Sequence, residues 1–117
     1  MLIRENKNIS REELKQIFYA LIETAKNEAM YDMEENDYEV SQCPGDATYN
    51  IGYITEEDLD EIYDIAGDCG AHCWSFNNLN LNPNQKYYLW VNIDYDKFNG
   101  FRQPTWGLGR MDDVIFV

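Results

Sequence analysis

Residues 10–34 read SREELKQIFYALIETAKNEAMYDME, and this pattern predicts one long amphipathic helix. Ser10, followed three residues later by Glu13, matches a capping box, which opens a helix by satisfying two backbone N–H groups. Apolar residues then recur three or four positions apart, which places them on one face of the helix. They are Leu14, Ile17, Phe18, Leu21, Ile22, Ala25 and Ala29. We therefore expect a helix from Ser10 to about Glu34 that turns this face into the core.

Shorter elements are predicted after this helix. Residues 36–46 are polar and broken by Pro44-Gly45, which favours a loop or a short edge strand. Large apolar residues alternate over 48–54, and this alternation predicts a strand. Thr55 is suited to cap a second helix. That helix would turn Leu59, Ile62, Tyr63 and Ala66 inward and end at Gly67 or Gly70.

The last third of the chain has the pattern of a sheet. Residues 87–95 are rich in aromatic and β-branched residues and form the best predicted strand. Asn99-Gly100 predicts a hairpin turn, after which Phe101 begins an antiparallel return whose length Pro104 and Gly107 limit. Weaker patterns predict a brief strand at 74–76, a loop at 77–85 and a closing strand at 113–117. The predicted class is α+β, with two helices packed on a small, mostly antiparallel sheet.

Length and composition are those of one ordinary domain. With 117 residues, 44% of them hydrophobic, the chain can build its own core, so we assign 1–117 to a single domain. No apolar run approaches the roughly 20 residues needed to cross a bilayer. Three cysteines are too few, and odd in number, for a disulfide scaffold. We expect a soluble protein that is not exported, in the reducing cytoplasm.

The formal net charge of −13 is concentrated in the middle of the chain. Between Asn27 and Gln85 there are fourteen Asp and Glu residues and no Lys or Arg, whereas both flanking segments are close to neutral. A chain with a pI of ≈ 4.2 is repelled by DNA, RNA and anionic membranes. We therefore expect no direct nucleic-acid or membrane binding, and a basic protein as partner. A general need for solubility would spread acids evenly along the chain. The concentration of acids in one region therefore favours a partner that binds that region.

The second predicted helix carries acids that its own stability does not require. Glu56, Glu57 and Asp58 lie in the first turn, where the helix dipole favours negative charge. Asp64 and Asp68 lie near the other end, where the dipole disfavours it. Like charges four residues apart add a cost of roughly 0.2–0.5 kcal/mol per pair. Lys or Arg at half of these positions would have stabilised the helix instead.

The same acids are predicted to form a row on the helix surface. At 1.5 Å per residue the row spans about 16 Å opposite the apolar face. Its negative charges are spaced more widely than the phosphates of a DNA strand but form a similar linear array. Its members are Glu57, Glu61, Asp64 and Asp68. Four acids at the end of the first helix, Glu34, Glu35, Asp37 and Glu39, extend this surface if the two helix ends lie close together.

Cys69, His72 and Cys73, with the distant Cys43, are ligand types that zinc accepts, so a structural Cys₃His site is conceivable. The spacing lacks the paired Cys-x-x-Cys of strong zinc motifs, and buried thiols explain the cysteines more simply. Cys69 or Cys73 with His72 also form a possible nucleophile and base. No orienting third group or pocket is visible for them. We expect no catalytic residue, no metal site and no cofactor.

Asp94 and Asp96 lie in a segment that resembles a calcium-binding loop only superficially. Phe98 occupies the position of the third oxygen ligand, so an EF-hand is rejected. The hairpin turn at Asn99-Gly100 explains the segment better. It predicts both aspartates on the exposed side of a strand.

In size and composition the chain resembles the small acidic phage-encoded anti-defence proteins that inhibit CRISPR effectors or restriction enzymes by imitating nucleic acid. The residues that carry this resemblance are also those expected to bind the partner: Glu34, Glu35, Asp37, Glu56, Glu57, Asp58, Asp60, Glu61, Asp64 and Asp68. The resemblance implies an inhibitor in the host cytoplasm whose carboxylates displace phosphates from Arg and Lys of a nuclease. It also implies apolar anchors, for which Tyr31, Tyr38 and Tyr63 are candidates.

Two alternatives use the same residues. One is an immunity protein that neutralises a nuclease toxin by plugging its basic cleft. The other is a non-inhibitory acidic interaction protein whose carboxylates are only solvated. A neighbouring toxin gene would favour the immunity protein, and a phage or mobile-element setting would favour the anti-defence protein.

Overall fold

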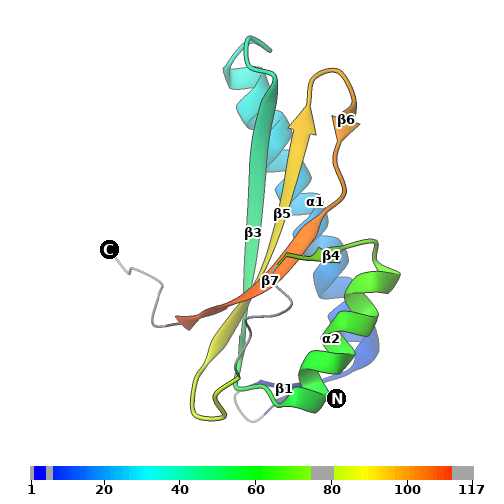
Figure 1. Cartoon of the computed structure of the whole chain (residues 1–117), viewed down its shortest axis with the longest axis vertical. Helices are drawn as coiled ribbons and strands as arrows, with labels where there is room; N and C mark the ends of the chain where they lie inside the picture. The colour runs from blue at the N-terminus through cyan, green and yellow to red at the C-terminus, as the bar shows by residue number, and fades with distance from the viewer. Residues whose placement is uncertain (1, 5–6, 75–80, 112–117) are drawn as a thin grey trace.

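The computed structural model describes residues 2–4, 7–74 and 81–111, which form two helices and two sheets (Figure 1). The main sheet has the strand order β3-β5-β7-β4, with β6 also pairing with β5, and only the β4–β7 pair is parallel. The other sheet is the hairpin β1-β2. The predicted α+β class is confirmed. The elements are β1 (Leu2–Arg4), β2 (Lys7–Ile9), α1 (Arg11–Glu35), β3 (Gln42–Gly52), α2 (Glu56–Asp68), β4 (His72–Cys73), β5 (Tyr87–Asp96), β6 (Gly100–Phe101) and β7 (Thr105–Arg110).

Helix α1 begins at the predicted residue. The Ser10 hydroxyl oxygen accepts a hydrogen bond from the backbone N–H of Glu13 at 3.1 Å. The Glu13 carboxylate accepts from the Ser10 hydroxyl at 3.3 Å instead of reaching the Ser10 backbone, so half of the predicted capping box is formed. The predicted apolar face is buried, with Ile17 half-buried at its edge.

Strand β3 begins at Gln42, so the predicted start at residue 48 is wrong and Pro44-Gly45 lies inside the strand. β3 is the edge strand of the main sheet, where proline can lack its backbone N–H without breaking a ladder. Gly45 brings the strand backbone against α1. A Cβ atom there would lie 1.9 Å from the Ala25 carbonyl oxygen and 2.8 Å from the Ala29 backbone nitrogen. Pro44-Gly45, a pattern that normally breaks regular structure, therefore lies at a close backbone contact between α1 and the sheet.

The C-terminal hairpin is confirmed at its predicted turn. β5 covers the predicted strand, and Gly100, with a φ of +81°, pairs with Asp96 across the turn at Asn99-Gly100. The predicted exposure of Asp96 is wrong, because its carboxylate is buried and accepts from the backbone N–H groups of Phe98 and Asn99 at 2.8 and 3.1 Å. These bonds, chiefly the one from Phe98, lower the pKa of Asp96. The aspartate closes the turn.

Two other predictions about the sheet need correction. Gly107 lies in the middle of β7 and does not limit it. The strand in this part of the chain, β4, consists of His72–Cys73 and ends before Trp74, where the predicted strand was to begin. Residues 75–76, the first part of the predicted loop (77–80) and the predicted strand at 113–117 lie outside the described residues, and residues 81–85 form a loop as predicted.

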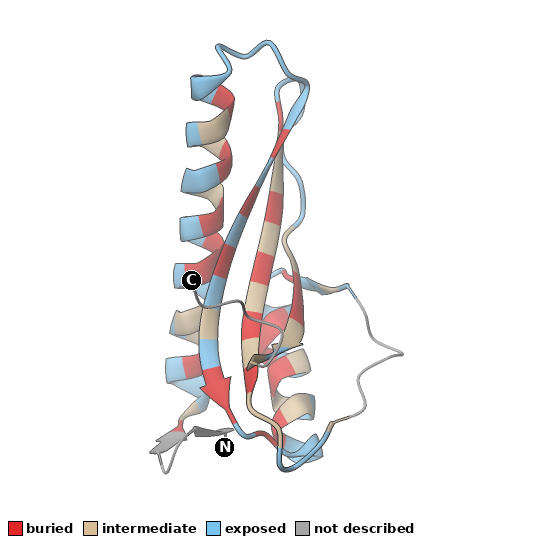
Figure 2. Ribbon diagram, turned by 90° about the vertical axis from the view of Figure 1, so that its left-hand side faces the viewer, coloured by how far each residue is buried: buried red, intermediate tan, exposed pale blue. Residues whose placement is uncertain are grey.

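The helices leave one face of the main sheet uncovered within the described residues. α1 covers the other face along β3 and β5, while α2 lies beside β4 and packs against α1 (Figure 2). Alternate β5 side chains point into this core, where the Trp106 ring lies 6.0 Å from that of Phe18 and 5.0 Å from that of Tyr63. The intervening β5 side chains are only half-buried on the face without a helix.

Candidate partner-binding surface

Asp58, one of the predicted binding residues on α2, is a buried capping residue. The Thr55 hydroxyl accepts from the Asp58 backbone N–H at 3.2 Å, and the Asp58 carboxylate accepts from the Thr55 backbone N–H at 2.8 Å. This complete capping box buries Asp58, which is 3% exposed. Asp58 is therefore not part of a binding surface. Its spacing of three residues from Thr55 was the sequence signal for this role.

The other acids of α2 mostly face solvent. The buried positions Ile62, Ile65 and Ala66 form the opposite face of the helix. At 3.6 residues per turn, four exposed acids fall in one arc that spans about 16 Å along the axis. We call these four the α2 acidic row: Glu57, Asp60, Asp64 and Asp68. Glu56 is also exposed, at the first turn beside the row.

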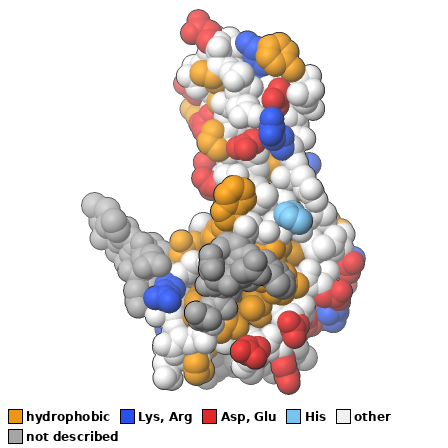
Figure 3. Space-filling view, in the orientation of Figure 1, with side chains coloured by type: hydrophobic (Ala, Val, Ile, Leu, Met, Phe, Trp, Pro, Cys, Tyr) orange, Lys and Arg blue, Asp and Glu red, His pale blue; other side chains and the backbone are white. Residues whose placement is uncertain are grey.

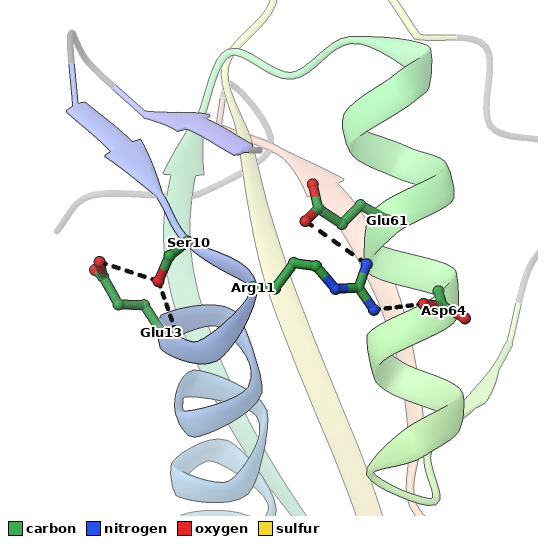
Figure 4. Close-up of polar contacts among 5 residues, drawn as sticks. All are labelled: Ser10, Arg11, Glu13, Glu61 and Asp64. Carbon is green, nitrogen blue, oxygen red and sulfur yellow. Dashed lines mark hydrogen bonds and ion pairs between the residues drawn. The ribbon is translucent and has the colours of Figure 1, made fainter.

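Arg11 reaches this face from the first turn of α1 (Figure 4). Its Nη2 atom lies 2.5 Å from Asp64 Oδ2, and its Nη1 atom lies 3.7 Å from Glu61 Oε1. The hydrogen bond to Asp64 raises the pKa of Arg11 above its ordinary value. The Glu61 side chain is only 12% exposed, so its predicted place in the row is taken by Asp60. Arg11 lies more than fifty residues away in sequence, so the spacing of acids within the helix could not reveal it.

The acids at the end of α1 do not extend the α2 acidic row. Glu34, Glu35 and Asp37 are exposed as predicted. However, α2 packs near the start of α1, where Cys69 Sγ lies 3.9 Å from the Lys15 carbonyl oxygen. At 1.5 Å per residue, Glu34 lies about 28 Å further along the helix axis. The two acidic groups occupy opposite ends of the molecule (Figure 1), and the predicted continuous surface does not form.

Two of the three predicted tyrosine anchors are separated from α2. Tyr31 and Tyr38 are exposed, but Tyr31 lies near the far end of α1 and Tyr38 lies just after that end. Tyr63 is half-buried beside Trp106. The α2 acidic row therefore has neither Tyr31 nor Tyr38 beside it, and the ring of Tyr63, the predicted anchor on α2, packs against Trp106.

The cysteines and the histidine do not assemble a site. Cys43 lies on β3 and Cys73 on β4, which are three strand spacings apart, on the order of 14 Å. His72 is exposed, whereas Cys73 points to the other side of β4 and its thiol lies 3.8 Å from the Tyr63 hydroxyl. Burial raises the pKa of Cys69, which disfavours the reactive thiolate. Across residues 2–4, 7–74 and 81–111, no group of three His, Cys, Asp or Glu side chains is placed to hold a metal ion.

Tyr63 makes the free energy of unfolding depend on pH in the alkaline range. Burial, with a contribution from the Cys73 thiol, raises its pKa to about 12 from an ordinary value of 10.0. Between these values the folded protein keeps the phenol proton while the unfolded chain loses it, so the free energy of unfolding should fall as pH rises. Tyr63→Phe has no proton to lose and should show a shallower fall when urea unfolding is measured across this range. Equal slopes for the two proteins would contradict this role.

Comparisons of this chain with protein-family models, curated proteins and solved structures found no match. Among the described residues, neither helix is long and apolar enough to span a membrane.

Proposed function

We propose that the chain is an inhibitor that binds a nucleic-acid-handling protein, a CRISPR effector or another host defence nuclease, and blocks its access to nucleic acid. The α2 acidic row is the proposed contact surface, and it would occupy a cleft lined by Arg and Lys. Carboxylates form short, strong hydrogen bonds with guanidinium and ammonium groups, as phosphates do. The role is one of binding, without catalysis or a cofactor.

The observation that carries the proposal is a line of exposed like charges that weakens its own helix. Asp60 lies four residues from both Glu56 and Asp64, and Asp64 lies four residues from Asp68. Each such pair costs roughly 0.2–0.5 kcal/mol, and no basic residue occupies the last turn of α2 to offset the dipole. Arg11 is the one described base that pairs with the row, through Asp64. Exposed residues that destabilise their own helix are typical of residues retained for function.

Two variants with equal charge change test the proposal. The first is the triple variant Asp60→Asn, Asp64→Asn, Asp68→Asn, and the matched control is Glu34→Gln, Glu35→Gln, Asp37→Asn at the opposite end of the molecule. Each removes three negative charges. Binding is measured against purified CRISPR effectors, restriction nucleases and nuclease toxins at moderate salt. We expect the first variant to weaken Kd on the order of 100-fold, because truncating close interfacial charges costs about 1 kcal/mol or more each, and the control to change Kd little.

The same variants separate lost binding from lost folding. The first variant relieves three repulsive pairs, although it also loses the Arg11–Asp64 ion pair, so it should unfold at nearly the same or slightly higher urea concentration. Equal weakening by both variants would mean that only net charge matters. Unchanged binding by the first variant would remove α2 from the interface. Binding to a nuclease toxin alone would establish the immunity alternative.

A further inference from the structure

The sheet face without a helix carries aromatic side chains whose positions are fixed by glycines on the next strand. In the β5–β7 register, Trp90 faces Gly107 and Tyr88 faces Gly109. A Cβ atom at Gly107 would lie 2.4 Å from Trp90 Cζ2, and one at Gly109 would lie 2.1 Å from Tyr88 Cζ. Both rings therefore lie across the neighbouring backbone. Apolar side chains gather on this face, with acidic side chains along α2 at its lower right edge (Figure 3).

A pocket of about 270 Å³ opens on this face beside Trp90. Its other lining residues are Asp46 of β3, Asn92 of β5, Thr105 of β7 and Trp74, the residue after β4. Trp74 is 73% exposed, although its backbone is held on the sheet by a 2.9 Å hydrogen bond to the Trp106 carbonyl. An exposed indole supplies a large contact area, and exposed tryptophans commonly dominate binding interfaces.

The carboxylate, amide and hydroxyl groups of the pocket keep acceptor capacity, beside the donors supplied by the second Asn92 N–H and the two indole N–H groups. Asn92 Nδ2 donates to Asp46 Oδ1 at 2.6 Å, and the Thr105 hydroxyl donates to the Asn92 backbone carbonyl at 3.4 Å. The second Asp46 oxygen, the Asn92 side-chain oxygen and the lone pairs of Thr105 can still accept. A ligand rich in donors and carrying positive charge would complement them.

We propose that this pocket binds the guanidinium group of an arginine side chain presented by a partner protein. Guanidinium is planar, has five donors and no acceptor, stacks on indole rings and carries the charge that pairs with Asp46. Phosphates and nucleic acids are disfavoured by the same carboxylate and by the net charge of −13. The pocket lies on the sheet face and not on α2, so this proposal does not depend on the function proposed for the α2 acidic row.

The test titrates the native chain with a short acetylated peptide that contains one arginine, while the indole N–H signals of Trp74 and Trp90 are followed by NMR. The comparison peptide contains citrulline, which keeps the shape of arginine without its charge, and an oligosaccharide tests for a sugar site. We expect saturable shifts of both indole signals with arginine and at least about fivefold weaker binding with citrulline.

Two single substitutions test the pocket walls. Asp46→Asn and Trp74→Ala should each weaken arginine binding about fivefold or more, since each removes one charge-based contact to the guanidinium. Glu28→Gln, which removes an exposed charge on α1, is the matched control and should bind like the native chain. Any of four results would overturn the proposal. The citrulline peptide could bind as tightly as the arginine peptide, or the oligosaccharide could bind more tightly. The arginine peptide could give no response at tens of millimolar, or both pocket variants could bind it like the native chain.

Discussion

Replacing Gly45 with alanine should destabilise the protein by about 3 kcal/mol or more, and replacing it with valine should prevent folding. A Cβ atom at this position would lie 1.9 Å from the Ala25 carbonyl oxygen. Both groups belong to the backbones of packed elements, so no side-chain rotation can relieve the contact. α1 and β3 would have to move apart, which would open the core along much of the sheet.

Urea unfolding measures this effect, and Gly67→Ala is the matched control. Gly67 lies in the last turn of α2, is exposed and would have nothing within 4 Å of an added Cβ atom. Alanine there should stabilise the protein by about 0.5 kcal/mol, because glycine weakens a helix. A Gly45→Ala variant as stable as the native chain would show that α1 and β3 are not packed as described.

Trp106→Ala should destabilise the protein by about 3–5 kcal/mol, the usual cost of removing a fully buried aromatic side chain. Trp106 is 1% exposed, and its ring contacts those of Phe18 on α1 and Tyr63 on α2. It therefore joins both helices to the sheet, and the resulting cavity would affect all three elements. Free energies of unfolding from urea denaturation give the measured difference.

The control for this substitution is the same change at an exposed tryptophan. Trp74→Ala removes a side chain that is 73% exposed and should alter stability by less than about 0.5 kcal/mol. Similar losses for both variants would contradict the assigned core. A neutral Trp74→Ala also confirms that the pocket variant is folded when its arginine binding is measured.

Elements defined by local sequence were predictable. The capping serine and the regular apolar spacing located α1, and Asn99-Gly100 located the hairpin, because each depends on residues close in the chain. β3 was not located correctly, because Pro44-Gly45 breaks structure locally but is accommodated at a sheet edge beside α1. The side chain of Asp96 was misplaced because its turn-closing bonds depend on the exact path of the hairpin.

The candidate surfaces were only partly visible in the sequence. The acidity of α2 was apparent, but the burial of Asp58 and the pairing of Arg11 with Asp64 changed which acids face solvent. The pocket of Trp74 and Trp90 was missed, because it combines residues from β3, β5 and β7 with the residue after β4. The sequence did contain a signal for this face. Large outward-facing residues recur every second position in β5, and glycines recur at the same spacing in β7, where they pair with them.

Competition for nucleic acid tests the proposed inhibition most directly. A fluorescent nucleic acid is bound to a nuclease that the chain binds, and its release is followed by anisotropy as the chain is added. We expect release by the native chain and by the Glu34→Gln, Glu35→Gln, Asp37→Asn control, but not by the Asp60→Asn, Asp64→Asn, Asp68→Asn variant at the same concentration. Two results would contradict inhibition through the α2 acidic row. One is nucleic acid that stays bound while the native chain occupies the enzyme. The other is equal release by the Asp60→Asn, Asp64→Asn, Asp68→Asn variant.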